Sequence, residues 1–474
     1  MPQLSHQDLI RLLTTPELKV VTQCADSIGR PCYAVGGFVR DIFLSGHKVS
    51  GSDIDCVCVG NGIEVARLVA STFGKKASLA IFKTYGTAQV KYKGKELEFV
   101  GARRESYSSD SRNPVVSEGT LDDDISRRDF TVNAMALSLN SANLAELVDP
   151  YNGMEDLRNG IIRTPLDPDI TFSDDPLRML RAIRFATRLN FEIYPETLEA
   201  ISRNAHRITI ITRERIATEL MKIMATSTPS RGWMLLEQTG LLAIILPQLA
   251  AMRGVETVNG KGHKDNFLHT LEVLDNVAAK SDNVWLRWAA LLHDIAKPVT
   301  KRWDDKLGWT FHNHNFIGAK MVGRIFKALR LPLDSKLKYV EKLVELHMRP
   351  IALVEDDVTD SAVRRLIHDA GDDLDDLMLL CSADITSKNP AKVKRLLQNF
   401  EHVKQKMVEL EERDHIRNYQ PPVDGIEIMK AFGIAQGKDV CLIKSAIKQA
   451  ILEGKVANEH DAAYEFMIVT GASL

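Results

Sequence analysis

Two aspartates one residue apart, in Asp53-Ile-Asp-Cys-Val-Cys58, form the first arrangement with evident chemistry. On a strand, alternate side chains point to one face, so Asp53 and Asp55 would lie side by side. Two ionised carboxylates repel each other, and a pair of Mg²⁺ ions would compensate while activating a hydroxyl and neutralising a triphosphate. We predict such a site, with Glu98 as a candidate third carboxylate. An exposed strand end is the alternative.

Two glycines precede these aspartates, in Tyr33-Ala-Val-Gly-Gly-Phe-Val-Arg-Asp41. An apolar run, then Gly36 and Gly37, then a helix would let backbone N–H groups approach a phosphate at a helix N-terminus. Arg40 lies one turn into that helix and could reach the same anion. Arg128, at a second expected helix start, could hold a triphosphate bidentately. A plain tight turn and an exposed basic helix end are the alternatives.

A second group of potential ligands consists of histidines and aspartates. His293 and Asp294 end the apolar run Trp288–Leu292, so both would point from a helix into a protected interior. An unpaired buried aspartate is costly, and a metal ion removes that cost. Imidazoles and carboxylates suit Mn²⁺, Fe²⁺, Ni²⁺, Zn²⁺ or Mg²⁺. The alternative is a helical body that only holds RNA. The further candidate residues are His269, His314, His347 and Asp384.

The elements that must position these residues change in kind along the chain. Residues 20–140 mix β-rich runs with helical stretches, which indicates an α/β region, and the pattern is helical from Tyr151 almost to the end. Leu177–Leu189 is an amphipathic helix, with Asp174 and Asp175 where an N-cap belongs and Pro176 at the first helical position. The expected strands are Cys32–Val35, Ile54–Val59, Ala88–Tyr92 and Leu97–Val100.

Composition narrows the function. The 474 residues carry 61 Lys plus Arg and 63 Asp plus Glu, a net charge of −2, which excludes a globally basic protein that coats nucleic acid. Six cysteines, without a CxxC pair or a zinc pattern, favour reduced thiols and a cytoplasmic location. The first residues lack the apolar core of a signal peptide, and no stretch reaches the roughly 18 apolar residues of a membrane span.

Five segments together resemble the class II template-independent nucleotidyltransferases, the family of bacterial CCA-adding enzymes (tRNA nucleotidyltransferases) and poly(A) polymerases. The resemblance implies an α/β nucleotidyltransferase head related to DNA polymerase β, followed by an all-α neck, body and tail. It also implies that Asp53 and Asp55 bind the catalytic Mg²⁺. The five segments are Gly36–Asp41, Asp53–Asp55, Arg127–Met135, Asp149–Gly153 and Asp174–Phe185.

The order His, His-Asp, His, His, Asp resembles the HD phosphohydrolase superfamily. This resemblance implies that four residues ligate a divalent metal of unspecified identity, and that His314 and His347 lie near the substrate or a second ion. The four expected ligands are His269, His293, Asp294 and Asp384. We therefore predict a head at 1–145, a helical neck at 146–255, an HD domain at 256–412 and a helical tail at 413–474.

In the nucleotidyltransferase family, the segment resembling Asp175-Pro-Leu-Arg178 serves as a protein template for the incoming base. Asp175 and Arg178 are three residues apart, so on a helix they would share a face. The carboxylate would accept from the amine of cytosine or adenine, and the guanidinium would donate to the neighbouring ring nitrogen. Guanine and uracil present a carbonyl there, which the carboxylate rejects. Arg181 continues the basic side toward phosphates.

The leading expectation is an enzyme that adds CMP, CMP and AMP to tRNA 3′ ends from CTP and ATP with Mg²⁺. A poly(A) polymerase or an A-adding enzyme is the alternative within the family. A third hypothesis is a protein that acts chiefly as a metal-dependent phosphohydrolase on RNA ends. The intact pair Asp53 and Asp55 argues against an inactive head.

Overall fold

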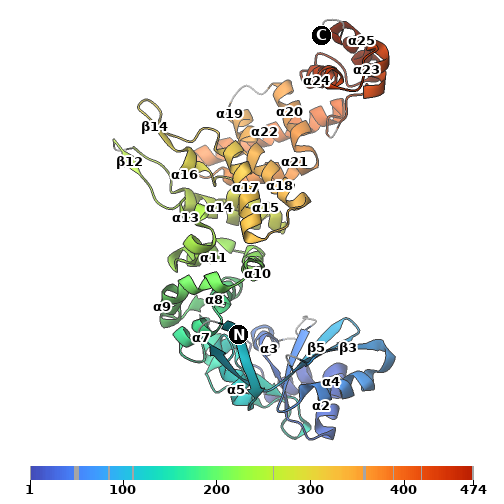
Figure 1. Ribbon diagram of the computed structural model, residues 1–474. Coiled ribbons are helices and arrows are strands. Elements are labelled where there is room, and N and C mark those ends of the chain that lie inside the picture. The colour runs from blue at the N-terminus through green and yellow to red at the C-terminus, as the bar shows by residue number, and fades with distance from the viewer. Residues whose placement is uncertain are drawn as a thin grey trace. The chain divides into compact units, whose positions relative to one another are not determined.

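The structure is a computed structural model that describes residues 2–46, 53–83, 86–108, 111–259, 261–355, 359–387, 389–417 and 419–471. It divides into two compact units (Figure 1). The first comprises Met1–Ile223 with Met234–Ile244, and the second comprises Met224–Trp233 with Ile245–Leu474. Among the described residues, no helix combines the length and the apolar character needed to span a membrane.

A seven-stranded mixed sheet, in the order β3-β4-β5-β2-β1-β8-β9, forms the centre of the first unit. Strand β2 pairs in parallel with β5 and antiparallel with β1, which places the strand of the two aspartates inside the sheet. The α/β head expected from the sequence is confirmed. The strands are β1 (Cys32–Val35), β2 (Asp53–Cys58), β3 (Ala77–Phe82), β4 (Thr87–Tyr92), β5 (Lys95–Gly101), β8 (Ala136–Ser138) and β9 (Leu147–Val148).

Apolar side chains and thiols fill the reverse face of the sheet. On β2, Ile54, Cys56 and Cys58 are buried, whereas Asp53 and Asp55 are exposed, as the alternation along a strand requires. The Sγ atoms of Cys58 and Cys32 lie 3.5 Å apart. All six cysteines are free; five are buried, and only Cys441 is exposed. Helix α4 (Gly62–Phe73) packs against β2, β3, β4 and β5 and α3 (Gly37–Ser45) follows β1.

The remainder of the first unit is helical and connects the sheet to the second unit. Helix α8 (Leu177–Leu189) has the predicted bounds. Asp174 ends the preceding helix α7 (Pro168–Asp174), and Asp175 has extended backbone with φ −135° and ψ 97°. The prediction that Asp175 and Arg178 share a helix face is therefore wrong, because the helix starts only after Pro176. Further helices of the first unit are α1 (His6–Leu13), α2 (Pro16–Ser27), α5 (Leu121–Ser126), α6 (Gly153–Asn159) and α9 (Pro195–Asn204). The division between the two units passes through α10 (Arg213–Met224), α11 (Pro229–Gln238) and α12 (Leu241–Ile245).

Packed helices build the second unit around a buried aromatic core. The Trp233 and Trp288 rings meet edge to face at 5.9 Å, and Trp288 meets Phe326 at 6.2 Å. The helices are α13 (Pro247–Ala250), α14 (Asn266–Ala278), α15 (Val284–Leu292), α16 (Lys297–Thr300), α17 (His314–Leu329), α18 (Ser335–Leu346), α19 (Met348–Glu355), α20 (Asp360–Ala370), α21 (Leu374–Asp384) and α22 (Pro390–Asp414). This confirms the predicted mostly helical body.

Further strand pairs lie outside the central sheet, and those whose strands have only two or three residues are too short for alternation to reveal them in the sequence. In the second unit they are the hairpins β12–β13 (Thr257–Val258 and Lys261–Gly262) and β14–β15 (Arg302–Asp304 and Gly308–Thr310). In the first unit, β10 (Ile161–Ile162) pairs with β11 (Glu192–Ile193) and β6 (Arg103–Ser108) pairs with β7 (Ser111–Glu118).

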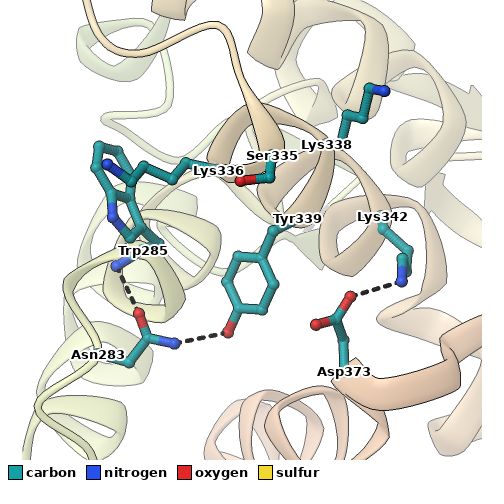
Figure 2. A pocket seen from close by; sticks show the side chains of 8 residues that line it. All are labelled: Asn283, Trp285, Ser335, Lys336, Lys338, Tyr339, Lys342 and Asp373. Carbon is teal, nitrogen blue, oxygen red and sulfur yellow. Dashed lines mark hydrogen bonds and ion pairs between the residues drawn. The ribbon is translucent and has the colours of Figure 1, made fainter.

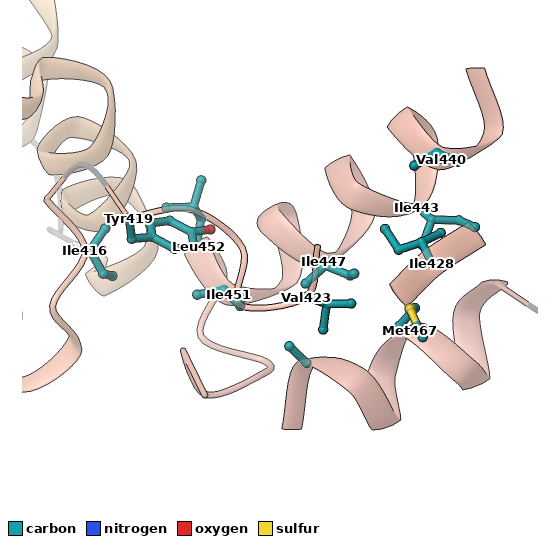
Figure 3. Packing of buried hydrophobic residues seen from close by; sticks show 11 residues of the cluster. Ile416, Tyr419, Val423, Ile428, Val440, Ile443, Ile447, Ile451, Leu452 and Met467 are labelled. Atoms are coloured by element: carbon teal, nitrogen blue, oxygen red, sulfur yellow. The ribbon is translucent and has the colours of Figure 1, made fainter. Parts of the chain in front are cut away.

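Three helices near the C-terminus have a hydrophobic core of their own. Val423, Ile428, Ile447 and Met467 are fully buried in it (Figure 3). Because these side chains come from α23 (Gly425–Phe432), α24 (Lys438–Leu452) and α25 (His460–Gly471) and the segment before them, the three helices are held together by their own apolar faces. This arrangement accounts for the helical tail that the sequence predicts.

Candidate functional site

The three predicted carboxylates lie on one face of the sheet in the first unit. Asp53 and Asp55 are exposed on β2, and Glu98 on β5 is the direct Cα partner of Asp55. Partial desolvation and the charge of Asp53 raise the pKa of Asp55, which Arg128 offsets in part. Desolvation and the charge of Asp55 likewise raise the pKa of Glu98. The carboxylates therefore repel one another, and a divalent cation with oxygen ligands fits the donor set.

The absence of a side chain at Gly36 lets the guanidinium of Arg128 lie next to these carboxylates. Gly36 begins α3 with φ +71°, a conformation that suits glycine. A Cβ atom here would lie 3.1 Å from Arg128 Nη1 and 3.5 Å from Asp55 Oδ2. The guanidinium of Arg128 also donates to Asp124 over 2.9 Å. The structure thus brings together the predicted residues Gly36, Arg128 and Asp55.

Arg40 lies one turn into α3, as predicted, and its side chain is bonded within the protein. Its side chain is only 4% exposed, and its Nη2 lies 2.7 Å from Asp41 Oδ1. Its Nη1 donates to Asn133 over 2.7 Å, and its guanidinium lies 5.1 Å from the centre of the Phe185 ring. An anion would have to displace these partners to reach it. Gly37 is packed against this guanidinium, with Arg40 Nη2 3.4 Å from its Cβ position.

Asp129 connects this buried group to helix α8. It accepts from Asn133 over 3.0 Å and from Arg181 Nε over 2.7 Å. Burial raises the pKa of Asp129, but Arg181 and Asn133 outweigh burial, so the pKa is lowered overall. Arg181, expected to meet phosphates, is thus held by a carboxylate inside the first unit.

The two residues of the expected base template are both anchored to the protein. Asp175 Oδ1 accepts the N–H of Leu177 over 3.1 Å and caps α8, and Asp175 Oδ2 lies 3.4 Å from Arg215 Nη2. Arg178 Nη2 donates to the carbonyl of Arg127 over 2.6 Å. These contacts fix the start of α8 relative to the segment that carries Arg128. Two anchored polar side chains in a fixed orientation are what discrimination between bases requires.

The six predicted histidines and aspartates of the second unit form one cluster. They come from α14, the ends of α15, α18 and α21, and the start of α17. Two sets of three have ligand atoms within 4.8 Å of one another: His269, His293 and Asp384, and Asp294, His314 and His347. Among the described residues only these two sets have their ligand atoms this close together. The carboxylates of Asp53, Asp55 and Glu98 in the first unit, taken as a set, lie further apart.

Asp294 belongs to the second set and also contacts the histidines of the first. Its Oδ2 is 3.2 Å from His293 Nε2 and 3.7 Å from His269 Nε2. Its Oδ1 is 3.4 Å from His314 Nε2 and 3.9 Å from His347 Nε2. One carboxylate therefore faces all four imidazoles, two on each oxygen.

Each imidazole is oriented by a bond on its outer nitrogen. The Nδ1 atoms of His293, His314 and His347 lie 2.6–2.7 Å from the carbonyls of Ala290, Phe311 and Val344. His269 Nδ1 lies 3.0 Å from the Thr386 hydroxyl. A carbonyl only accepts, so Nδ1 of His293, His314 and His347 carries a proton and Nε2 of these rings points into the cluster. Four inward imidazole Nε2 atoms and two carboxylates fit a divalent metal site.

The histidines of the cluster differ in the direction of their pKa shifts. Burial lowers the pKa of His347 to about 4, with the charge of His293 adding to the effect. Burial also lowers the pKa of His314. At His293 the carboxylates of Asp294 and Asp384 outweigh burial and raise its pKa to about 10. Its Nε2 is buried and lies 3.2 Å from Asp294 Oδ2 and 3.6 Å from Asp384 Oδ1. That atom thus suits a metal, which replaces the proton.

Three supporting residues carried no role in the sequence-based prediction. Lys297 Nζ lies 2.5 Å from Asp294 Oδ2. Thr386 orients His269, and Asp129 links Arg181 to Asn133. Lys297 lies three residues after Asp294, and this spacing could have predicted the ion pair between them. Thr386 carries no such signal, because its contact joins residues 117 positions apart.

A separate pocket of about 520 Å³ lies where α15 and α18 begin (Figure 2). Trp285 and Tyr339 form its apolar walls, and the Tyr339 hydroxyl is bound by Asn283. None of the six clustered residues lines it. His293 and His347 follow the opposite ends of the same two helices, so this pocket is distinct from the cluster.

Three family models match successive parts of the chain. The family models that match are the Poly A polymerase head domain at residues 32–163, the Probable RNA and SrmB- binding site of polymerase A at 190–253 and the HD domain at 266–387. The three matches follow one another in the order that the sequence predicts for head, neck and HD domain.

Curated relatives extend the similarity over most of the chain. An A-adding tRNA nucleotidyltransferase of Deinococcus radiodurans is 33% identical over 354 residues, 72% of this chain and 78% of the relative. A multifunctional CCA protein of Shewanella frigidimarina is 32% identical over 313 residues, 64% of this chain and 70% of the relative. The fold resembles that of the Bacillus stearothermophilus CCA-adding enzyme in complex with CTP, with a TM-score of 0.65, 23% identity and coverage of 97% of this chain and 99% of the other. The chain therefore belongs to the family of tRNA nucleotidyltransferases and bacterial poly(A) polymerases and is a nucleotidyltransferase with an HD domain.

Proposed function

We propose that this enzyme completes tRNA 3′ ends with C, C and A from CTP and ATP. The tRNA 3′ hydroxyl attacks the α-phosphorus, a new P–O bond forms, and the bond to the leaving pyrophosphate breaks. The observation that carries the proposal is the face shared by Asp53, Asp55 and Glu98, with Arg128 beside it. Similarity to tRNA nucleotidyltransferases supports tRNA as the acceptor.

Each side chain of this group has a distinct role in the proposal. Asp53 and Asp55, aided by Glu98, would hold Mg²⁺, which supplies activation of the hydroxyl and neutralisation of the triphosphate. Arg128 would contact the triphosphate. Asp175 and Arg178 would pair with the base edge, since a carboxylate accepts from an exocyclic amine and a guanidinium donates to a ring nitrogen.

Addition of A alone is the second candidate, because the Deinococcus radiodurans relative is an A-adding enzyme. The assay uses three tRNA acceptors, ending before the CCA, after its first C and after its second C. Each is incubated with one labelled nucleoside triphosphate at a time, and the ends are sequenced. CCA addition predicts C on the first two acceptors and A on the third. A-only activity leaves the first two unextended.

Variants separate the catalytic proposal from a folding defect. Asp53→Ala and Asp55→Ala should abolish addition while the unfolding temperature stays near that of the parent, because both side chains are exposed. Incorporation close to the parental rate with Mg²⁺ present would contradict the assignment.

A second activity is proposed for the HD domain, namely metal-dependent hydrolysis of a phosphoester at an RNA end. The four inward Nε2 atoms and the central carboxylate of Asp294 support it. His269, His293, Asp294 and Asp384 would hold one divalent ion, with His314 and His347 at the substrate or a second ion. The test is hydrolysis of a 2′,3′-cyclic nucleotide with Ni²⁺, Mn²⁺, Mg²⁺ or Zn²⁺, in the parent and in His293→Ala.

The domain bounds 1–145, 146–255, 256–412 and 413–474 and a cytoplasmic location also remain proposals. Limited proteolysis tests the bounds. The location rests on the low number of cysteines and on tRNA ends as the acceptor.

A further inference from the structure

One face of the hairpin β14–β15 is aromatic. Trp303 on β14 is the direct Cα partner of Trp309 on β15, and their ring centroids are 5.4 Å apart. Because side chains alternate along a strand, Lys301 and Phe311 continue the same face. Lys301 Nζ lies 5.1 Å from the centre of the Trp309 ring, as this alternation requires. All of these side chains are partly exposed.

The neighbouring hairpin β12–β13 extends this aromatic face. Strands β13 and β15 are in contact, and Figure 1 shows both hairpins projecting on the same side of the second unit. His263, which follows β13, meets Trp309 at 5.6 Å and Phe311 at 6.0 Å, edge to face in both cases. The partly exposed rings of Trp303, Trp309 and Phe311 thus lie together with the imidazole of His263, in a protein in which Phe, Trp and Tyr make up only 6% of the residues.

Direct contacts join the aromatic face to the HD cluster. Lys297 Nζ is 2.5 Å from Asp294 Oδ2 and 5.6 Å from the centre of the Phe311 ring. The carbonyl of Phe311 is the group that orients His314. Lys264, which follows His263, donates to the Thr386 hydroxyl that orients His269. The rings therefore lie at the border of the cluster.

We propose that Trp303, Trp309 and Phe311 form a nucleobase-binding platform that makes the HD domain select phosphoesters of nucleotides. The proposal rests on the proposed phosphohydrolase activity. A base is joined to its phosphate through one ribose, so a base-binding surface must lie beside the metal-binding group, as these rings do. Aromatic side chains stack with every base, which suits RNA ends of different sequence. Lys297, between ring and carboxylate, is placed to meet the phosphate.

The reaction consumes one water. Its oxygen bonds to phosphorus, and one of the two P–O bonds that join phosphorus to the ribose breaks. The freed ribose oxygen takes up the proton that the water gives up. The platform takes no part in these steps. It raises the affinity for substrates that carry a base. Removal of a platform ring should therefore lower kcat/KM for a nucleotide substrate and leave kcat/KM for a substrate without a base unchanged.

The experiment compares 2′,3′-cyclic AMP with 1-O-methylribose 2,3-cyclic phosphate, which lacks the base, in the full-length protein. Trp303→Leu removes the ring and keeps an apolar side chain, whereas Trp303→Phe keeps a ring. Leu307→Ala is the matched control, since Leu307 is 74% exposed in the turn of the same hairpin. We expect Trp303→Leu to lower kcat/KM for cyclic AMP about tenfold and to leave the base-free substrate unchanged. Trp303→Phe and Leu307→Ala should resemble the parent.

Three outcomes overturn the platform. Equal losses for both substrates would mean that the hairpin only shapes the metal-binding group. Unchanged constants for both would mean that the rings only pack against one another. If the parent hydrolyses neither substrate, the phosphohydrolase proposal fails, and calorimetric binding of adenosine 2′-monophosphate against 1-O-methylribose 2-phosphate still decides the platform. A preference for the base that Trp303→Leu does not reduce then contradicts it.

Discussion

His314 and His347 direct their Nε2 atoms at each other across 3.3 Å, while both Nδ1 atoms bond to main-chain carbonyls. Since carbonyls only accept, each Nδ1 holds a proton and the two Nε2 lone pairs face each other. Burial lowers the pKa of both rings, which keeps them neutral near pH 7. Two opposed lone pairs beside the Asp294 carboxylate are stabilised by a cation between them.

Divalent metal should therefore stabilise the second unit. In an Asp53→Ala background, Mn²⁺ at a hundredfold excess over its Kd should add about 2.7 kcal/mol to the free energy of unfolding. His347→Gln should remove most of this gain. His402→Gln, an exposed histidine on α22, is the control and should keep it. Thermal unfolding with and without metal gives the measurement. If metal stabilised the Asp53→Ala protein and the Asp53→Ala, His347→Gln double variant equally, the ion would bind elsewhere.

Glu98→Gln should slow nucleotide addition by on the order of 10²-fold, because the register partner of Asp55 loses its charge. Glu96→Gln is the matched control. Glu96 lies two residues earlier on the same face and is the Cα partner of Asp53, but its carboxylate is already neutralised by Lys91 over 3.0 Å. Single-turnover addition to tRNA measures both. Equal rates in the two variants would remove Glu98 from the catalytic group.

Asp175→Asn separates base selection from helix capping. The amide oxygen can still accept the Leu177 N–H, so the unfolding temperature should hold, whereas Asp175→Ala should cost about 1 kcal/mol of stability. If the carboxylate selects bases, Asp175→Asn lowers the ratio of CTP to UTP use by about five- to a hundredfold. Competition between the two nucleotides on one acceptor measures the ratio. A preserved ratio would leave Asp175 with the capping role only.

The Asp129 network should appear in the pH dependence of stability. The folded pKa of Asp129 is lowered, so its contribution is present above the unfolded pKa, near 4, and is lost as pH falls through the folded pKa. Asp129→Asn should cost about 3 kcal/mol at pH 7, because it removes the charged partner of Arg181, and the difference from the parent should shrink below about pH 4.

The control for this pH profile is Asp169→Asn. Asp169 pairs with Arg203 at 2.7 Å, but both side chains are about half exposed, at 45% and 51%. Asp169→Asn should therefore lower the free energy of unfolding by less than about 1 kcal/mol at any pH. Chemical unfolding of both variants from pH 3 to pH 8 makes the comparison, and parallel curves for the two would contradict the Asp129 assignment.

The fold and much of the site could be predicted because their signals are local. Helix α8 and strand β1 have the predicted bounds, since each is a periodic apolar run with clear ends. The pair Asp53 and Asp55 was recognisable as charge placed in a strand, and His293-Asp294 as charge placed at the end of a buried helix.

The remainder depends on contacts that no spacing encodes. Whether Arg40 faces an anion or the interior is decided by Asn133, which lies 93 residues further along the chain. The place of Asp175 depends on where Pro176 allows α8 to begin. Trp303 and Trp309 lie on strands of three residues, which are too short to show alternation in the sequence.

The distribution of the cysteines has a practical consequence for labelling. Thiol hydrogen bonding and burial raise the pKa of Cys32 and of Cys58 behind the sheet, and burial raises that of Cys381, so these thiols stay protonated and covered. Cys441, on α24, alone is exposed. A maleimide dye added to the native, unmodified protein would attach there once, and would report on the C-terminal helices without any engineered cysteine and without touching the strand that carries Asp53 and Asp55.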